Sequence, residues 1–156
     1  MAEYSANAVQ TVNPGESVVF DTTVFPCERG LVRHSDGTSN FLLSGWVPSN
    51  NVCPCCNTNR SAEYLVDLGA NIAIPTGGTV GQIAVAYAID GATIAYSEMD
   101  ATPAAVEEFF NISRAITVPV FNGCCQTVTV RNISDQPILL KNVSIRLTRP
   151  DLLYSR

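Results

Sequence analysis

The sequence predicts an all-β fold, an antiparallel sandwich or barrel of about nine strands. Three observations lead to this expectation. Apolar, β-branched and aromatic residues recur at a period of two along most of the chain. Turn-forming residues interrupt these runs at short intervals. Strand patterns do not alternate with helical ones, which argues against a parallel sheet built from βαβ units.

Each predicted strand is a short run that is rich in Val, Ile, Thr or aromatic residues. The segment 126–133 is a clear example, because Val128 and Val130 alternate with Thr127 and Thr129. The predicted strands are 17–24, 31–34, 40–46, 64–74, 82–89, 92–97, 108–120, 126–133 and 137–148.

Turn signals separate these strands. Asp90-Gly91 lies between two apolar runs, and Asp-Gly at such a place is typical of a type I′ hairpin. One segment, 102–110, has helical features instead, since Pro103 suits a first helical turn and acidic residues follow it. The other turn signals are Asn13-Pro14-Gly15, Asp36-Gly37, the segment 75–78, Asn122-Gly123 and the segment 134–137.

The length of 156 residues suits one domain, on a prior of roughly 100–200 residues per domain. We expect a single domain over 1–156, with a short N-terminal arm at 1–7 and a C-terminal tail at 150–156. Residues 1–10 are polar, and neither a signal peptide nor a transmembrane helix is expected. Such a protein acts where it is made or leaves the cell by assembly, lysis or a non-classical route.

Charge narrows the classes of partner. Fourteen acidic residues outnumber nine basic ones, so the formal net charge is −5 and the basic footprint of a nucleic-acid-binding protein is missing. Charged residues make up 15% of the chain, below the usual quarter or so of a soluble domain. This low fraction suggests surface buried in an oligomer. Lys141 is the only lysine; a preference for arginine suits interfaces, although lineage bias would leave the same pattern.

The cysteines form the most unusual pattern in the sequence. When antiparallel strands connect up and down or as a Greek key, successive loops alternate between the two ends of the sandwich. The cysteines fall in the first, third and seventh loops between the predicted strands, provided that 31–34 is a strand. All of them therefore belong to one end. The six residues are Cys27, Cys53, Cys55, Cys56, Cys124 and Cys125.

Three chemistries remain open for this cysteine cluster. A structural disulfide cluster is the preferred interpretation, and sequence alone cannot choose its pairing. Free buried thiols are the second alternative. A zinc site is the third, but metal sites favour gaps of two to four residues between ligands, and Cys124 and Cys125 are adjacent. Synthesis inside a cell favours reduced thiols at first, and disulfides would then form on release.

The sequence offers little support for catalysis, so we expect no enzyme, no cofactor and no metal site. Four acidic residues gather around one loop without the spacing of a calcium loop, which favours a solvated acidic loop. His34 has Arg33 and Asp36 nearby but no nucleophile motif, so a structural or interface role is expected. An aromatic platform for a glycan would have to come from residues that suit the core better. The acidic residues are Glu98, Asp100, Glu107 and Glu108, and the aromatic candidates are Trp46, Tyr64, Tyr87 and Tyr96.

Several segments resemble a known family. They are NAVQTVNPG at 7–15 followed by Val18-Val19-Phe20, RGLVRH at 29–34, Gly37 with NFLLSG at 40–45, and NGCCQ at 122–126. They resemble a small jelly-roll domain of collagen-like and exosporium-type surface proteins of Firmicutes and of their phages, which is similar to the jelly roll of tumour necrosis factor and the complement globular head. The resemblance covers about 5–151 and implies a trimer-forming jelly roll, with an apolar face of each protomer near a threefold axis.

The family often carries this domain on a collagen-like stalk, which this sequence lacks. We therefore expect a homotrimeric virion protein of a phage, docked on a capsid or another particle-surface protein. It would act in capsid decoration or stabilisation, or as a head fibre or knob for host attachment. A bacterial spore or cell-surface protein and a carbohydrate-binding adhesion module with a surface glycan as ligand are the alternatives. No membrane insertion is expected.

Overall fold

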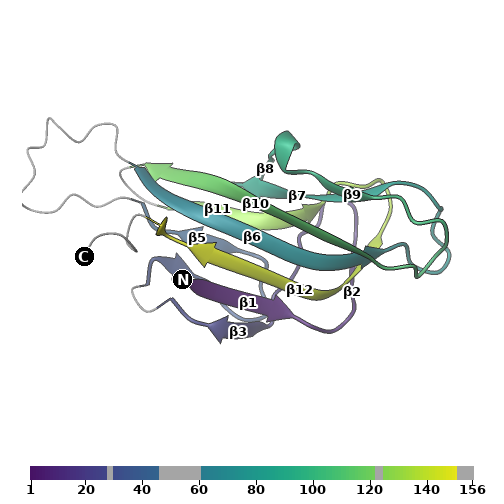
Figure 1. Cartoon of the computed structure of the whole chain (residues 1–156), viewed down its shortest axis with the longest axis horizontal. Coiled ribbons are helices and arrows are strands. Elements are labelled where there is room, and N and C mark those ends of the chain that lie inside the picture. Colours follow the sequence, from purple (N-terminus) through teal and green to yellow (C-terminus); the bar gives the residue numbers. More distant parts are fainter. Residues whose placement is uncertain (28–29, 46–60, 122–124, 151–156) are drawn as a thin grey trace, which may run out of the picture.

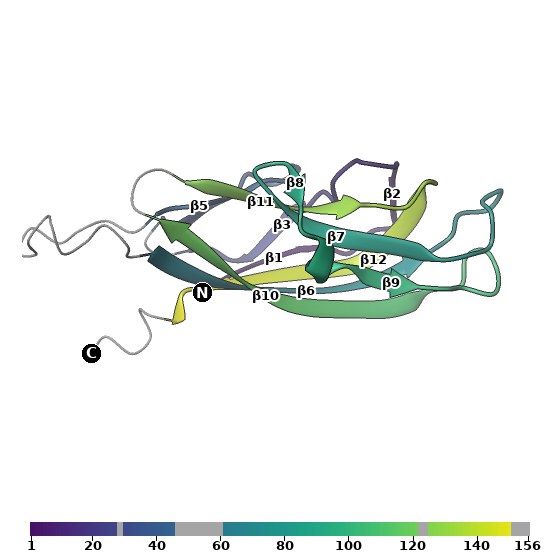
Figure 2. The same ribbon diagram turned by 90° about the horizontal axis from the view of Figure 1, so that it is seen from above.

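The computed structural model describes residues 1–27, 30–45, 61–121 and 125–150. Two antiparallel sheets form the two layers of a sandwich (Figures 1 and 2). Sheet A has the order β10-β6-β12-β1-β3, with β2 also paired to β12, and sheet B has the order β4-β5-β11-β7-β8, with β9 also paired to β7. Sheet A consists of β1 (Ala2–Ala6), β2 (Gln10–Val12), β3 (Thr22–Phe25), β6 (Ser61–Ala73), β10 (Phe110–Phe121) and β12 (Ile138–Thr148). Sheet B consists of β4 (Val32–Arg33), β5 (Phe41–Leu43), β7 (Ile83–Ile89), β8 (Ala92–Thr93), β9 (Met99–Ala101) and β11 (Gln126–Asn132).

The all-β prediction is confirmed, and each of the nine predicted segments contains a strand. Two segments depart from their predicted form. The segment 17–24 first makes two isolated bridges, Ser17 with Arg131 and Phe20 with Thr38, before β3 begins. The segment 92–97 is a strand only as far as Thr93, and a 3-10 turn, η2 (Ala95–Ser97), follows.

The expected N-terminal arm at 1–7 is corrected by the structure. Its residues contain β1, which lies inside sheet A with β12 on one side and β3 on the other. Ala2, Tyr4 and Ala6 are buried, whereas Glu3 and Ser5 face outward. The alternation is present in the sequence, but two of its three buried residues are alanines, so the hydrophobic signal is weak.

No residue of 102–110 is helical. The segment is a loop that its own acidic side chains organise. The carboxylate of Glu108 accepts hydrogen bonds from the backbone N–H groups of Ala104 and Ala105, at 3.0 and 3.2 Å. Glu107 has a φ of 59°, and its N–H donates to the carbonyl of Ile74 at 2.7 Å. These backbone N–H groups of the segment therefore donate to a side chain and to a distant carbonyl, and not to the carbonyls four residues earlier that a helix would use.

The core lies between the two sheets, and two of its tyrosines, Tyr64 and Tyr87, are completely buried. The Tyr87 hydroxyl donates to the carbonyl oxygen of Arg114 at 2.7 Å, and that of Tyr64 donates to the carbonyl oxygen of Ser44 at 2.7 Å. A buried hydroxyl needs such a partner. Burial raises the pKa of Tyr87 far above its ordinary value. The largest fully buried side chains are Tyr64, Tyr87, Phe20, Phe41, Leu43, Leu68, Ile72, Ile74, Ile83, Ile138, Leu140 and Ile145.

Candidate functional site

One end of the sandwich holds the strand ends that flank the cysteine-bearing segments. Strand pairing places Leu43, the last residue of β5, opposite both Val32 of β4 and Gln126 of β11. It also places Phe121, the last residue of β10, opposite Ser61, the first residue of β6. We call this the cysteine end, and it lies at the left in Figure 1. The chain enters 46–60 and leaves it again at this end.

Two of the six cysteines lie within the described residues. Cys27 follows β3, is half-buried and packs against the core. Cys125 directly precedes β11 and is disulfide-bonded. Both positions agree with the expectation that the cysteine loops share one end. Cys53, Cys55, Cys56 and Cys124 lie outside the described residues, so the structural cysteine cluster as a whole stays a prediction.

The outer face of sheet A carries large apolar side chains that are exposed. Leu65 of β6 is 40% exposed between buried Tyr64 and Val66, and Phe121 of β10 is 59% exposed beside buried Val120. Phe25 of β3 is 52% exposed. It pairs with Glu3, whose carboxylate meets Arg146 on the same outer face. We call Phe25, Leu65 and Phe121 the exposed apolar set.

Small residues occupy the middle of the same face. Gly69 of β6 lies between Ser113 of β10 and Ser144 of β12, and Ser5 of β1 pairs with Ser144 on the next strand. A methyl group at Gly69 would only touch the Ser144 hydroxyl, at 3.5 Å. The row is therefore a low strip across four strands, along which another backbone or ligand can approach the sheet closely.

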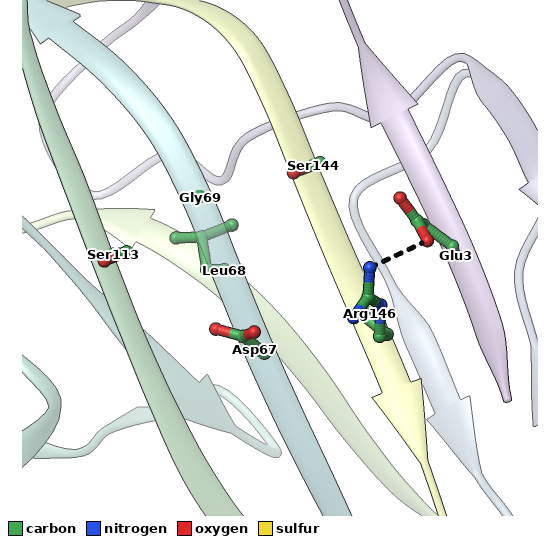
Figure 3. Close-up of a pocket in the computed structure, with 7 residues that line it drawn as sticks. All are labelled: Glu3, Asp67, Leu68, Gly69, Ser113, Ser144 and Arg146. Carbon is green, nitrogen blue, oxygen red and sulfur yellow. Dashed lines mark hydrogen bonds and ion pairs between the residues drawn. The ribbon is translucent and has the colours of Figure 1, made fainter.

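A shallow depression of about 230 Å³ is centred on this strip (Figure 3). Arg146 forms an ion pair with Glu3 at 3.4 Å, with the arginine side chain 54% exposed. Asp67 lies opposite Arg146 in the strand register, and its carboxylate makes no ion pair among the described residues. The depression thus combines two carboxylates, one guanidinium and two serine hydroxyls. The lining residues are Glu3, Asp67, Leu68, Gly69, Ser113, Ser144 and Arg146.

The acidic residues singled out in the sequence do not form a common site. Asp100 accepts a hydrogen bond from the Gln82 amide at 3.0 Å, and Glu107 accepts one from the Thr76 hydroxyl at 3.0 Å. Glu108 holds its own loop, and among the described residues the side chain of Glu98 makes no hydrogen bond or ion pair with the other three. Within the described ranges, no three His, Cys, Asp or Glu side chains are placed to hold a metal ion. Three of the four carboxylates therefore stabilise the local chain through hydrogen bonds and do not converge on a ligand.

The three candidate tyrosines, which the structure describes, do not form an aromatic platform. Tyr64 and Tyr87 are completely buried in the core. Tyr96 of η2 is 64% exposed, and Trp46 lies outside the described residues. His34 sits in a cluster of aromatic rings between the sheets, which agrees with the structural role expected for it. Among the described residues, no helix has the length and apolar character needed to cross a membrane.

The sequence did not single out the outer face of sheet A. Strand periodicity marks Leu65 only as one member of an outward-facing set, and outward positions of a strand are normally polar. Phe121 lies one residue beyond the predicted strand 108–120. That these residues share a face with Phe25 depends on the order of strands in sheet A. This order comes from long-range pairing, for which the sequence has no local signal.

No family model matches the chain, and no curated protein matches its sequence. Solved structures do match its fold. The globular domain of zebrafish complement 1qA protein has a TM-score of 0.58 at 7% identity, over 93% of this chain and 94% of that one. Eiger TNF from S. frugiperda has a TM-score of 0.60 at 11% identity, over 95% and 90%. The PRD1 vertex protein P5 has a TM-score of 0.46 at 9% identity, over 92% and 93%, which is too low to support an argument. With two antiparallel sheets in this order, the chain has the jelly-roll fold of the tumour-necrosis-factor and complement-globular-head type.

Proposed function

We propose that this chain is a non-enzymatic structural protein that works as a homotrimer on the outside of a particle. A phage virion is the particle that we favour. There it would decorate or stabilise the capsid, or form a head fibre or knob for host attachment. The observation that supports the proposal best is the exposed apolar set on the outer face of sheet A. In a monomer these side chains would remain in water.

The physical argument starts from the composition of this face. Aromatic residues are enriched at protein interfaces, and Phe25 and Phe121 stand at its two opposite edges. The small residues around Gly69 form the next outward row beyond Phe25 in the strand register, and they keep the surface low there, so that a second protomer could pack closely. Identical protomers that meet through two different surfaces close into a ring when the rotation between them allows it. A rotation of one third of a turn between neighbouring protomers closes such a ring with three copies.

Oligomeric state is the first test. We expect the purified protein to sediment near three times 16.7 kDa. Replacing Phe121 by Ser should weaken assembly, because it removes an aromatic side chain that is 59% exposed on the face in question. Tyr96→Ser is the matched control, because Tyr96 is similarly exposed, at 64%, but follows β8 of sheet B. A monodisperse monomer would contradict the trimer, and equal effects of the two substitutions would contradict the outer face of sheet A as its interface.

Location is the second test. A virion protein should be present in purified phage particles at a copy number that fits the symmetry of the capsid or tail. Its absence from particles, together with extraction from an outer spore coat or a cell surface, would favour the spore or cell-surface alternative.

The depression around Gly69 favours a second function, binding of a surface glycan. Carboxylates, a guanidinium and hydroxyls are the groups that recognise sugar hydroxyls. Substituting Asp67 by Asn should then reduce binding in a glycan-array assay, whereas Asp135→Asn, a change on a distant turn, should leave it unchanged. Arrays that show no binding above background for the unchanged protein would exclude the adhesion module.

A further inference from the structure

The single histidine of the chain connects the two sheets. His34 stacks on Phe41 of β5, with ring centroids 4.4 Å apart and 17° between the ring planes. Tyr4 of β1 meets the imidazole edge-on at 4.8 Å, and Phe20 does so at 6.3 Å. The imidazole therefore lies between sheet A and sheet B, on the side of the sandwich where β3 and β4 are the edge strands.

Both ring nitrogens of His34 face backbone carbonyl oxygens. Nδ1 is 2.9 Å from the carbonyl oxygen of Asn40, and Nε2 is 3.1 Å from that of Phe20. A neutral imidazole has one N–H and can donate to only one of them, so its other nitrogen would face an acceptor with a lone pair. A doubly protonated imidazole donates to both. Stacking on Phe41 also favours the positive ring, because a cation is attracted to an aromatic face.

We propose that His34 is a proton-dependent latch between the sheets. With two protons it ties the carbonyls of Phe20 and Asn40 to the aromatic cluster. When it loses one proton, one of these hydrogen bonds breaks. The segments that it joins are otherwise held by short backbone contacts. Phe20 N–H donates to the carbonyl of Thr38 at 2.9 Å, and the Phe20 carbonyl also accepts from Gly37 N–H at 2.8 Å. Asn40 precedes the three-residue strand β5.

Other titratable groups lie near the ring, and their protonation must be distinguished from that of His34. Tyr4 keeps its proton well into the alkaline range, because burial, and then the charges of Cys27 and Asp36, raise its pKa. Asp36 also accepts a hydrogen bond from the Thr23 hydroxyl at 2.7 Å. Carboxylates and arginine ordinarily keep their charge from about pH 5 to pH 7.5, where histidine changes its own. The titratable and charged groups near the ring are Tyr4, Asp21, Cys27, Arg33 and Asp36.

Thermal unfolding against pH tests the latch. The latch strengthens the fold when the ring carries both protons, so its contribution is present at acidic pH and is lost as the pH rises. Between about pH 5 and pH 7.5 the melting temperature of the unchanged protein should fall by about 2–4 °C more than that of His34→Gln. Glutamine does not titrate, so this variant reports the pH dependence of all other groups. Equal slopes for the two proteins would overturn the proposal.

Nitrogen NMR of the unchanged protein gives an independent readout, because one histidine produces one pair of ring signals. At about pH 5 we expect both ring nitrogens as N–H, with both protons slow to exchange, and one N–H at about pH 7.5. A ring with a single N–H at about pH 5, or two N–H protons that exchange at once with water, would refute the latch. This measurement decides the matter even if His34→Gln fails to fold.

Discussion

Single side chains span the core of this sandwich with polar atoms at their tips. Tyr87 belongs to β7 in sheet B, and its hydroxyl reaches the backbone of β10 in sheet A. Tyr64 belongs to β6 in sheet A, and its hydroxyl reaches the carbonyls of Leu31 and Ser44 beside sheet B. Each tyrosine therefore ties one layer to the other through a hydrogen bond that tolerates little displacement. The alternating strand pattern predicts that both are buried, but not where their hydroxyls end.

Replacing Tyr87 by Phe should reduce the free energy of unfolding by about 1 kcal/mol near neutral pH, because the carbonyl of Arg114 loses its donor. The same substitution should also change how the free energy of unfolding depends on pH in the alkaline range. Burial raises the pKa of Tyr87 in the folded chain, whereas the unfolded chain ionises near 10. The native state therefore holds more protons above about pH 10, and its stability falls as the pH rises further.

Urea unfolding at several alkaline pH values measures this effect. The fall above about pH 10 should be shallower in Tyr87→Phe than in the unchanged protein, because one buried phenol is gone. Tyr96→Phe is the control, since Tyr96 is 64% exposed and its loss of a hydroxyl should change neither quantity. An alkaline slope that is the same in all three proteins would show that Tyr87 is not the group responsible.

Strand β1 is short but makes contacts that the whole sandwich depends on. It is five residues long, yet it pairs with β12 from Ala2 to Ala6 and with β3 on its other side. Through Glu3 it also supplies one wall of the depression, and through Tyr4 one ring of the cluster around His34. An arm could be removed without effect on the sandwich, but an interior strand could not.

Tyr4→Ala distinguishes an arm from an interior strand. The Tyr4 side chain is 3% exposed, and truncating a buried aromatic ring costs about 3–5 kcal/mol in other proteins. We expect a loss of this size in the free energy of unfolding, measured in urea. Ser5→Ala on the outward face of the same strand should change it by less than about 0.5 kcal/mol. A small effect of Tyr4→Ala would mean that β1 adds little to the fold.

At the scale of the whole molecule, the sequence predicts the directions in which successive strands run better than it predicts the number of strands. Three strands, β1, β2 and β9, were missed, yet loop counting still places Cys27 and Cys125 at one end. The reason is that β8 and β9 both pair antiparallel with β7, so they run in the same direction and count as one strand. The strands β1 and β2 precede the first counted loop and do not alter the count.

The arrangement of side chains across strands could not be predicted in this way. Asn132 continues the alternation of β11, but the structure buries it completely. Its amide donates to the carbonyls of Val12 and Gln136, at 2.9 and 3.0 Å, and its oxygen accepts from Ser134 N–H. These partners come from β2 and from the turn before β12. Their meeting depends on pairing across 120 positions of sequence, which a local pattern does not encode.

The shared end of the cysteine loops leads to a prediction about the whole molecule. Because strand pairing brings these loops to the cysteine end, disulfides there would join loops from both sheets. We expect protein that is unfolded without reductant to take up fewer than six alkyl groups, as measured by mass spectrometry. Cys125, which is disulfide-bonded, should remain unlabelled. The reduced sample is the control and should take up six, one for each cysteine of the chain. Six groups on the unreduced protein would contradict the disulfide interpretation and leave free thiols or a metal site.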